Sequence, residues 1–185
     1  MRKLIAMSVL SLMLPILGCG SMSMTPSSQS GEMPKDGELM FPKDYKTFPT
    51  FLKGIQKPNA VRDLHINMIG SKAQQGQPFA NGSILVMEVF KAQKDMNDEL
   101  AKDTQGNLVK GELAKVLVMQ KGNGWGMNAP AGMKNGNWIY SAFKPNGERI
   151  DVDYAKCRGC HLPLGDAKDY VHRYDEYFEK RGSTY

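Results

Sequence analysis

The 185-residue sequence predicts an α+β domain built mainly as an antiparallel β-sheet with flanking helices. Three observations favour this class. Segments rich in branched and apolar residues recur between turn signals through the middle of the chain. An aromatic stripe with helical spacing lies near the C-terminus, and a Cys-x-x-Cys-His motif stands between the last expected strand and that helix.

Four segments are expected to be strands: 63–70, 81–92, 112–121 and 137–145. The clearest is "NGSILVMEVFKA" (81–92), where an Asn-Gly turn signal precedes a run of branched and apolar residues. The segment "DLHINMIG" (63–70) alternates as a strand does, which separates its side chains into two sets: His65, Asn67 and Ile69 against Leu64, Ile66 and Met68. A Gly-rich loop separates the last two strands.

Helices are expected at the two ends of the domain. In "FPKDYKTFPTFLKG" (41–54), Pro42 suits a first helical turn and Pro49 limits the helix to a short piece. The segment "AKDYVHRYDEYFEKR" (167–181) predicts an amphipathic helix, because its aromatic residues follow the spacing i, i+4, i+7 and i+8: Tyr170, Tyr174, Tyr177 and Phe178.

The N-terminus has the features of an export signal. Arg2 and Lys3 precede an apolar run at 4–17, which is too short for a membrane-spanning helix and has the length of a signal-peptide core. The following "ILGC" resembles the lipobox of bacterial lipoproteins, which implies lipidation of Cys19. An ordinary signal peptide cleaved near Gly20 is the alternative. By resemblance to lipoprotein sorting rules, Gly20 favours the outer membrane, facing the periplasm or the cell surface.

We therefore expect three parts: a lipoprotein signal peptide at 1–18, a lipid anchor and flexible linker at 19–38, and a single domain at 39–185. The linker is rich in Ser, Gly, Pro and Met without periodicity. Loss of Arg2 and Lys3 lowers the formal net charge from +5 to +3. The chain has no dense basic cluster, so we expect no nucleic-acid binding.

The three cysteines fall into two groups. If Cys19 carries lipid, only Cys157 and Cys160 remain, and no cysteine is left for a disulfide elsewhere. In an oxidising compartment, the Cys-x-x-Cys pair of an exported chain becomes a disulfide, a metal ligand set or a covalently capped pair.

The histidine directly after the second cysteine favours haem attachment. Cys157 and Cys160 are spaced to reach the two vinyl groups of one haem, and His161 is then the proximal iron ligand. A zinc site needs further ligands, and only the isolated His65 and His172 remain. A redox dithiol needs a βαβ context that this segment lacks. The motif therefore predicts one covalent haem c.

Several segments together resemble the cytochrome P-460 family and its relatives, the cytochromes c′-beta. They are, in order, "FPKDY", "FANGSILVMEV", "NWIYSAF", and "AKCRGCH" followed by "DYVHRY". The resemblance implies a mainly antiparallel domain, often a homodimer, that holds a five-coordinate c-type haem. It also implies oxidation of hydroxylamine, or binding of nitric oxide and related small ligands.

The chain departs from this pattern at Met87. In the hydroxylamine-oxidising members, a lysine of this strand is cross-linked to the haem edge, and Met87 stands at that position before Glu88. Lys91 does not replace it, because it lies four residues on, about 13 Å along a strand. The distal carboxylate of those enzymes has no counterpart here either, and Lys115 is the nearest polar residue. We therefore expect small-ligand binding without the cross-link.

Two alternatives stay open from the sequence. One is a haem oxidoreductase acting on hydroxylamine, nitric oxide or peroxide. The other is an electron-transfer cytochrome with a sixth iron ligand and a redox partner protein.

Candidate pocket residues follow from the same segments. We expect Met87 to contact the haem. The alternatives are that it only packs in the core or that it is a sixth iron ligand. Trp138 and Tyr140 are expected pocket walls, as are Trp125 and Phe143. His65 and His172 are also candidate iron ligands, but we expect His172 to pack or to lie at the surface and His65 to be a half-exposed polar residue.

Overall fold

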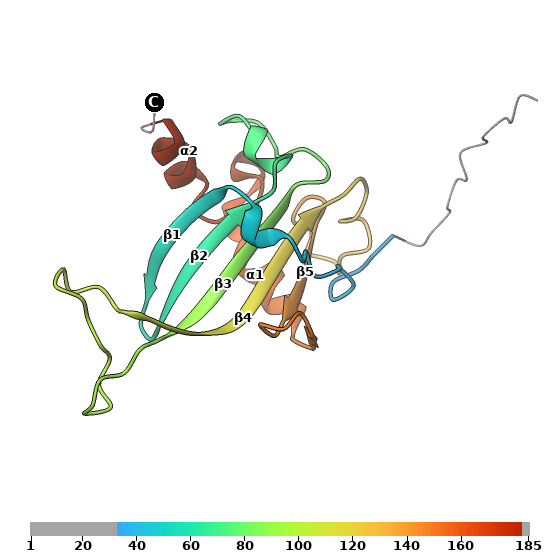
Figure 1. Ribbon diagram of the computed structural model, residues 1–185. Coiled ribbons are helices and arrows are strands. Elements are labelled where there is room, and N and C mark those ends of the chain that lie inside the picture. The colour runs from blue at the N-terminus through green and yellow to red at the C-terminus, as the bar shows by residue number, and fades with distance from the viewer. Residues whose placement is uncertain (1–32, 183–185) are drawn as a thin grey trace, which may run out of the picture. The chain divides into compact units, whose positions relative to one another are not determined.

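The computed structural model describes residues 33–182, so the expected signal peptide and Cys19 lie outside the described residues. The described chain forms one six-stranded sheet in which every neighbouring pair is antiparallel and the strand order follows the sequence (Figure 1). Its strands are β1 (Thr50–Lys57), β2 (Ala60–Ile66), β3 (Ile84–Ala92), β4 (Lys110–Lys121), β5 (Trp138–Phe143) and β6 (Arg149–Ile150). This confirms the predicted α+β, mainly antiparallel class.

Helical elements are short. The two α-helices are α1 (Tyr154–His161) and α2 (Tyr174–Gly182), and the 3-10 turns are η1 (Tyr45–Thr47), η2 (Gly70–Lys72), η3 (Leu162–Leu164) and η4 (Asp166–Lys168). The cysteine motif forms the end of α1, between the last strand and the last helix, as predicted. Among residues 33–182, no helix is both long and apolar enough to cross a membrane.

The first strand was not predicted. The segment 41–54, expected to begin with a short helix, contains only η1 before the chain enters β1. β2 also ends earlier than expected, at Ile66, because the Asn67 side chain forms a turn. Its Oδ1 accepts hydrogen bonds from Gly70 N at 3.0 Å and from Ile84 N at 3.1 Å. Residues 67–70 therefore do not continue the strand, although the sequence pattern predicts a strand over 63–70.

The C-terminal helix is shorter than predicted. It begins at Tyr174, and three residues before it adopt left-handed backbone angles: φ is 45° at Asp169, 58° at Tyr170 and 61° at Arg173. A helix over the whole of 167–181 is therefore wrong, although the aromatic stripe does dock. Tyr174, Tyr177 and Phe178 are all buried.

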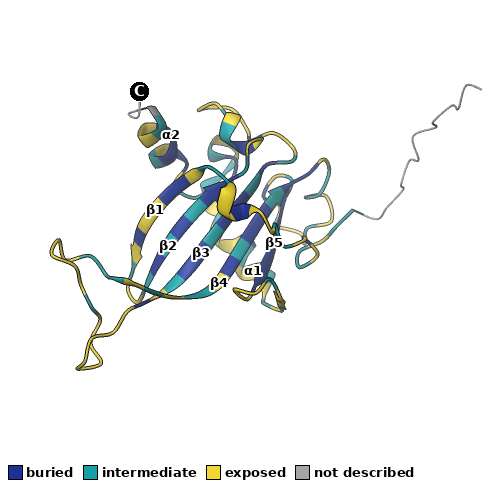
Figure 2. Cartoon of the chain, in the orientation of Figure 1, coloured by how far each residue is buried: buried dark blue, intermediate teal, exposed yellow. Residues whose placement is uncertain are grey.

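The two faces of the sheet bury different clusters. We call the face that carries Leu85, Met119 and Tyr140 the inner face; it packs against the aromatic residues of α2. The opposite, outer face carries Val86, Val118 and Ile139 and is covered by the segment that contains Leu39 and Tyr45. Side chains alternate between the two faces along each strand. Where both faces are covered the strand is largely buried, as in β5 (Figure 2).

Contacts of the globular part begin before residue 39. Gly37 N donates to Tyr140 O at 2.7 Å, and Asp36 Oδ1 accepts from Tyr140 N at 3.0 Å. These two residues form a turn that hydrogen-bonds to β5, within the segment that composition alone assigns to the linker.

Candidate functional site

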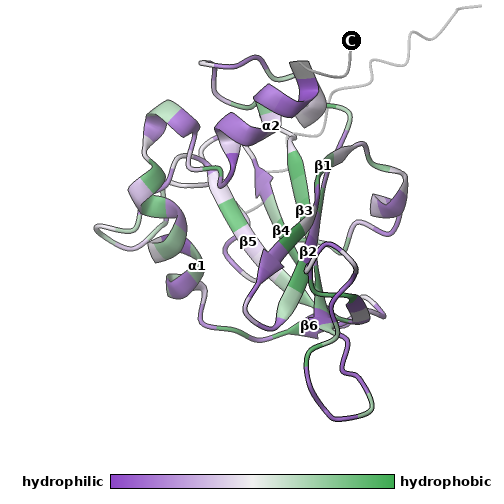
Figure 3. Cartoon of the chain, turned by 90° about the vertical axis from the view of Figure 1, so that its left-hand side faces the viewer, coloured by the Kyte–Doolittle hydropathy of each residue, from purple (hydrophilic) through white to green (hydrophobic). Residues whose placement is uncertain are grey.

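A cavity of about 360 Å³ lies between α1 and the inner face of the sheet. Figure 3 shows α1 standing to one side of the strands. Antiparallel register places Leu64, Met87 and Leu117 side by side on β2, β3 and β4, and all three line the cavity. Leu85 and Met119 form the next row along the strands. The sheet therefore presents an apolar wall.

The opposite wall carries the cysteine motif. The Asp153 side chain caps α1 by accepting a hydrogen bond from Ala155 N at 3.1 Å. The spacing i, i+3, i+4 then brings Cys157, Cys160 and His161 to one side of the helix, and all three line the cavity. Both cysteines are free thiols in the structure.

His161 is prepared as a metal ligand. Its Nδ1 lies 2.7 Å from the Tyr170 carbonyl oxygen, which can only accept, so Nδ1 carries the proton and Nε2 keeps its lone pair. Burial lowers the pKa of His161 to about 4, against the hydrogen bond to Tyr170, which acts in the opposite direction. The imidazole is therefore neutral at pH 7, which is the form that binds iron.

Two aromatic rings hold His161 in place. Tyr140 lies with its ring 5.1 Å from that of His161, and His172 packs edge-on at 4.7 Å. His172 Nε2 donates to the Cys160 carbonyl at 3.2 Å and contacts Cys160 Sγ at 3.3 Å. His172 therefore lies beside His161 on the α1 side of the cavity, not across from it.

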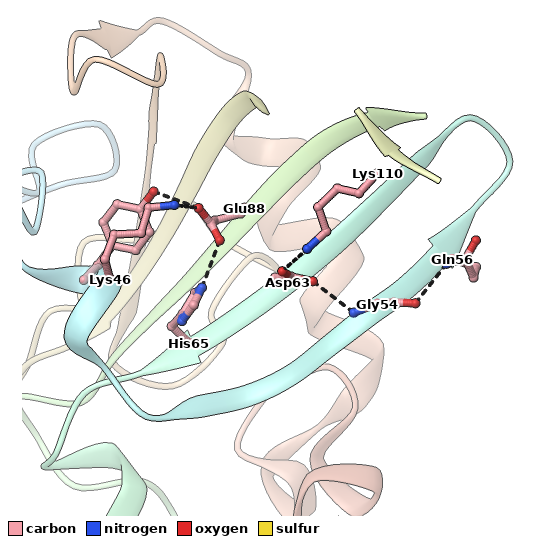
Figure 4. Close-up of polar contacts among 8 residues, drawn as sticks. Lys46, Gly54, Gln56, Asp63, His65, Glu88 and Lys110 are labelled. Carbon is pink, nitrogen blue, oxygen red and sulfur yellow. Dashed lines mark hydrogen bonds and ion pairs between the residues drawn. The ribbon is translucent and has the colours of Figure 1, made fainter. Parts of the chain in front are cut away.

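His65 lies on the outer face of the sheet. Its Nε2 is 3.0 Å from Glu88 Oε2, and Tyr45 and Lys46 hydrogen-bond to the other oxygen of the same carboxylate (Figure 4). The sheet separates this cluster from the cavity, so in this structure His65 does not contribute to it.

The remaining aromatic candidates are spread over the fold. Tyr140 lines the cavity, whereas Trp138 is fully buried behind it and donates from Nε1 to the Asp169 carbonyl at 2.9 Å. Phe143 and Trp125 pack in the outer-face cluster. Lys115, opposite Val89 in the sheet, is exposed.

Arg158, between the two cysteines, is a residue whose role the sequence did not reveal. It is only 3% exposed, and its guanidinium bonds Asp36 at 2.6 and 3.1 Å and Asn135 Oδ1 at 2.6 Å. A charged side chain inside an otherwise conventional motif was the only available signal. Arg158 ties α1 to the segment that precedes the sheet and to the loop before β5.

One edge of the cavity is cationic, and sequence reasoning missed this as well. Lys57, Arg62 and Arg173 come from β1, β2 and the turn before α2, and all three line the cavity. Arg62 Nε is buried without a hydrogen-bond partner. Haem carries two carboxylates, and an unpaired buried guanidinium nitrogen is suited to one of them.

The cavity therefore fits a haem on three counts: apolar walls, a cationic edge and the Cys157–Cys160–His161 set. Among residues 33–182, no group of three or more His, Cys, Asp and Glu side chains is placed to hold a metal ion by itself. The Cys-x-x-Cys-His motif on one wall of this apolar cavity indicates a c-type haem protein. Within that class, the family model of cytochrome P460 matches residues 42–173, and the chain belongs to this family. A comparison with curated proteins gives no match.

Proposed function

We propose that the protein binds nitric oxide or a related small ligand at a five-coordinate haem iron, without a haem–lysine cross-link. The observation that carries this proposal is the apolar sheet wall that faces His161 across the cavity, formed by Leu64, Met87 and Leu117. A neutral diatomic ligand needs no charged partner in such a pocket, and the wall keeps water and anions away from the open iron position.

Covalent attachment follows from the two thiols. Cys157 and Cys160 would each hold the haem through a thioether, formed by addition of the thiol S–H across one vinyl group, which needs no oxidant. His161 would supply Nε2 to the iron from the same helix turn, and Arg62 and its cationic neighbours would bind the haem carboxylates. When bound, the haem supplies the iron that takes the ligand.

Two features support ligand binding over turnover. Oxidation of hydroxylamine requires proton removal, and no Asp or Glu is among the residues that line the described cavity. Met87, at the position of the cross-linking lysine, has no amine that could bond the haem edge. The cavity therefore has no carboxylate to remove the proton, and position 87 has no lysine to form the cross-link.

Titration of the ferrous holoprotein with nitric oxide tests this proposal. We expect a stoichiometric complex, recorded by its optical spectrum, and no consumption of hydroxylamine over many equivalents. The intact denatured mass should equal chain plus one haem, and Cys157→Ala with Cys160→Ala should lose the haem on denaturation. Catalytic consumption of hydroxylamine, or a third haem–protein bond in β3 by peptide mapping, would contradict the proposal.

A haem oxidoreductase is the second candidate, and the unpaired Arg62 Nε in the cavity favours it. A guanidinium that meets the bound ligand in place of a haem carboxylate can stabilise negative charge that develops on that ligand. Turnover of hydroxylamine or peroxide that is lost in Arg62→Met would support this candidate.

We further propose export and lipid anchoring through Cys19 at the outer membrane, with a homodimeric domain and a redox partner protein. The order of basic residues, apolar run, small residue and cysteine supports the anchor. Cys19→Ala should move the protein from the membrane fraction to the soluble periplasmic fraction, and ultracentrifugation of the soluble form gives its oligomeric state.

A further inference from the structure

A buried ion pair joins the end of β4 to the turn that follows α1. Lys121 Nζ lies 2.7 Å from both carboxylate oxygens of Asp169, and the two side chains are 8% and 7% exposed. The Lys121 ammonium also lies 5.6 Å from the ring centroid of Trp138. Burying two charges is costly, so an arrangement this enclosed needs full hydrogen bonding to persist.

The other polar groups of Asp169 are also engaged. Its Oδ2 accepts from Phe79 N at 2.8 Å, its carbonyl accepts from Trp138 Nε1 at 2.9 Å, and its own N–H donates to Asp166 O at 2.9 Å. Asp169 is therefore fixed by contacts from three separate parts of the chain.

These contacts hold a strained stretch of backbone in place. Asp169 and Tyr170 are consecutive non-glycine residues with φ of 45° and 58°. Left-handed angles are unfavourable for both, and more so for tyrosine, so surrounding contacts must hold them. The result of holding them is that the Tyr170 carbonyl points at His161 Nδ1, 2.7 Å away.

We propose that Lys121 and Asp169 are positioning residues for the axial ligand: they hold Tyr170 in its left-handed conformation, so that its carbonyl orients His161 and increases its electron donation. This inference rests on the proposed function, in which His161 binds haem iron. Neither residue lines the cavity, so the pair acts on the iron only through Tyr170 and His161.

The effect on the iron has a defined direction. A hydrogen bond from Nδ1–H to a carbonyl makes the imidazole a stronger donor, which strengthens the iron–histidine bond and favours the ferric state. When the ion pair is removed, the turn at 169–170 relaxes and this hydrogen bond weakens. The iron–histidine stretching band should then move to lower frequency, and the midpoint potential should rise.

The experiment uses purified holoprotein with Lys121→Met and a matched control, Lys110→Met. Lys110 also pairs with a buried aspartate, Asp63, but on the outer face of the sheet. Resonance Raman spectra of the ferrous proteins give the iron–histidine band, and redox titration gives the potential. We expect both to shift in Lys121→Met and neither to shift in Lys110→Met, although both variants lose stability.

Two further variants cover the case in which Lys121→Met does not fold. Asp169→Asn keeps an acceptor for Phe79 N and a residue type that tolerates left-handed angles, and should give a smaller shift in the same direction. Lys121→Arg retains the charge and should stay near the wild-type band. An unchanged band in both Lys121→Met and Asp169→Asn, with a normal wild-type band, would overturn this inference alone. A wild-type ferrous protein that lacks any five-coordinate iron–histidine band would overturn the proposed function, and the inference with it.

Discussion

Met87 lies at the centre of the cavity wall, between Leu64 and Leu117 in the register of the sheet. Its thioether is flexible and apolar, and a wall of leucines on both sides suits contact with a flat haem face. We therefore assign Met87 a contact role and not a ligand role.

Met87→Leu tests that assignment. Leucine preserves the volume and the apolar character but has no sulfur. We therefore expect the spin state to stay the same and the nitric oxide affinity to change less than about threefold, in line with the small cost of such swaps. Optical spectra and ligand titration measure both quantities. A wild-type low-spin spectrum that becomes high-spin in Met87→Leu would show that the sulfur was bound to iron.

At this scale, sequence reasoning succeeds where a pattern exists and fails where it does not. Cys157, Cys160 and His161 form a motif with fixed spacing, and the structure brings them to one wall of the cavity. Arg62 and Arg158 are single charged residues, and their roles arise only from folding: one faces the cavity through strand register, the other is buried against Asp36. Arg62 has no local signal that distinguishes it from a surface arginine, and the place of Arg158 inside the motif does not show which residues it contacts.

At the scale of elements, α1 carries the cysteine motif, and the hydrogen bonds of Arg158 attach α1 to the rest of the domain. We expect Arg158→Met to lower the free energy of unfolding by about 3 kcal/mol, because Asp36 and Asn135 lose a buried partner. Denaturant unfolding of the holoprotein measures the change. The matched control is Lys156→Met, since Lys156 is 85% exposed and forms only a 3.8 Å pair with Asp153. Its effect should stay within about 0.5 kcal/mol. Equal losses in both variants would contradict the attachment role.

Elements differ in how far the sequence determines them. β3, β4 and β5 are predictable because their apolar runs are long enough to show strand character. β1 contains Gly54 and two lysines, Lys53 and Lys57, that hide its pattern, and it forms because β2 offers it an edge. The region before α2 has helical spacing, but the contacts of Asp169 with Lys121 and Trp138 override it. Tertiary contacts decide both cases.

At the scale of the whole molecule, the sheet has one face for the cofactor and one for stability. The outer face includes the Glu88 cluster (Figure 4). Burial would raise the pKa of Glu88, but hydrogen bonds from Lys46, His65 and Tyr45 outweigh it and hold that pKa below the ordinary 4.5. A carboxyl with a lowered folded-state pKa stabilises the fold above its unfolded pKa, and the contribution is lost as the pH falls through the folded value.

Glu88→Gln should therefore lower stability at pH 7 by on the order of 1 kcal/mol, and should make the loss of stability below pH 4.5 shallower than in the wild type. Denaturant unfolding at several pH values between neutral and acidic conditions measures both effects. Glu112→Gln, which changes a largely exposed side chain, is the control. Parallel pH profiles for wild type and Glu88→Gln would contradict the role of this cluster.

The optical and resonance Raman spectrum of the purified ferrous protein, before any ligand is added, tests the central claim most directly. In the proposed function His161 binds the iron from one side, and an apolar wall that includes Met87 lies across the cavity. This arrangement predicts a high-spin, five-coordinate iron that converts to a nitrosyl complex when nitric oxide is added. A low-spin, six-coordinate spectrum would contradict it.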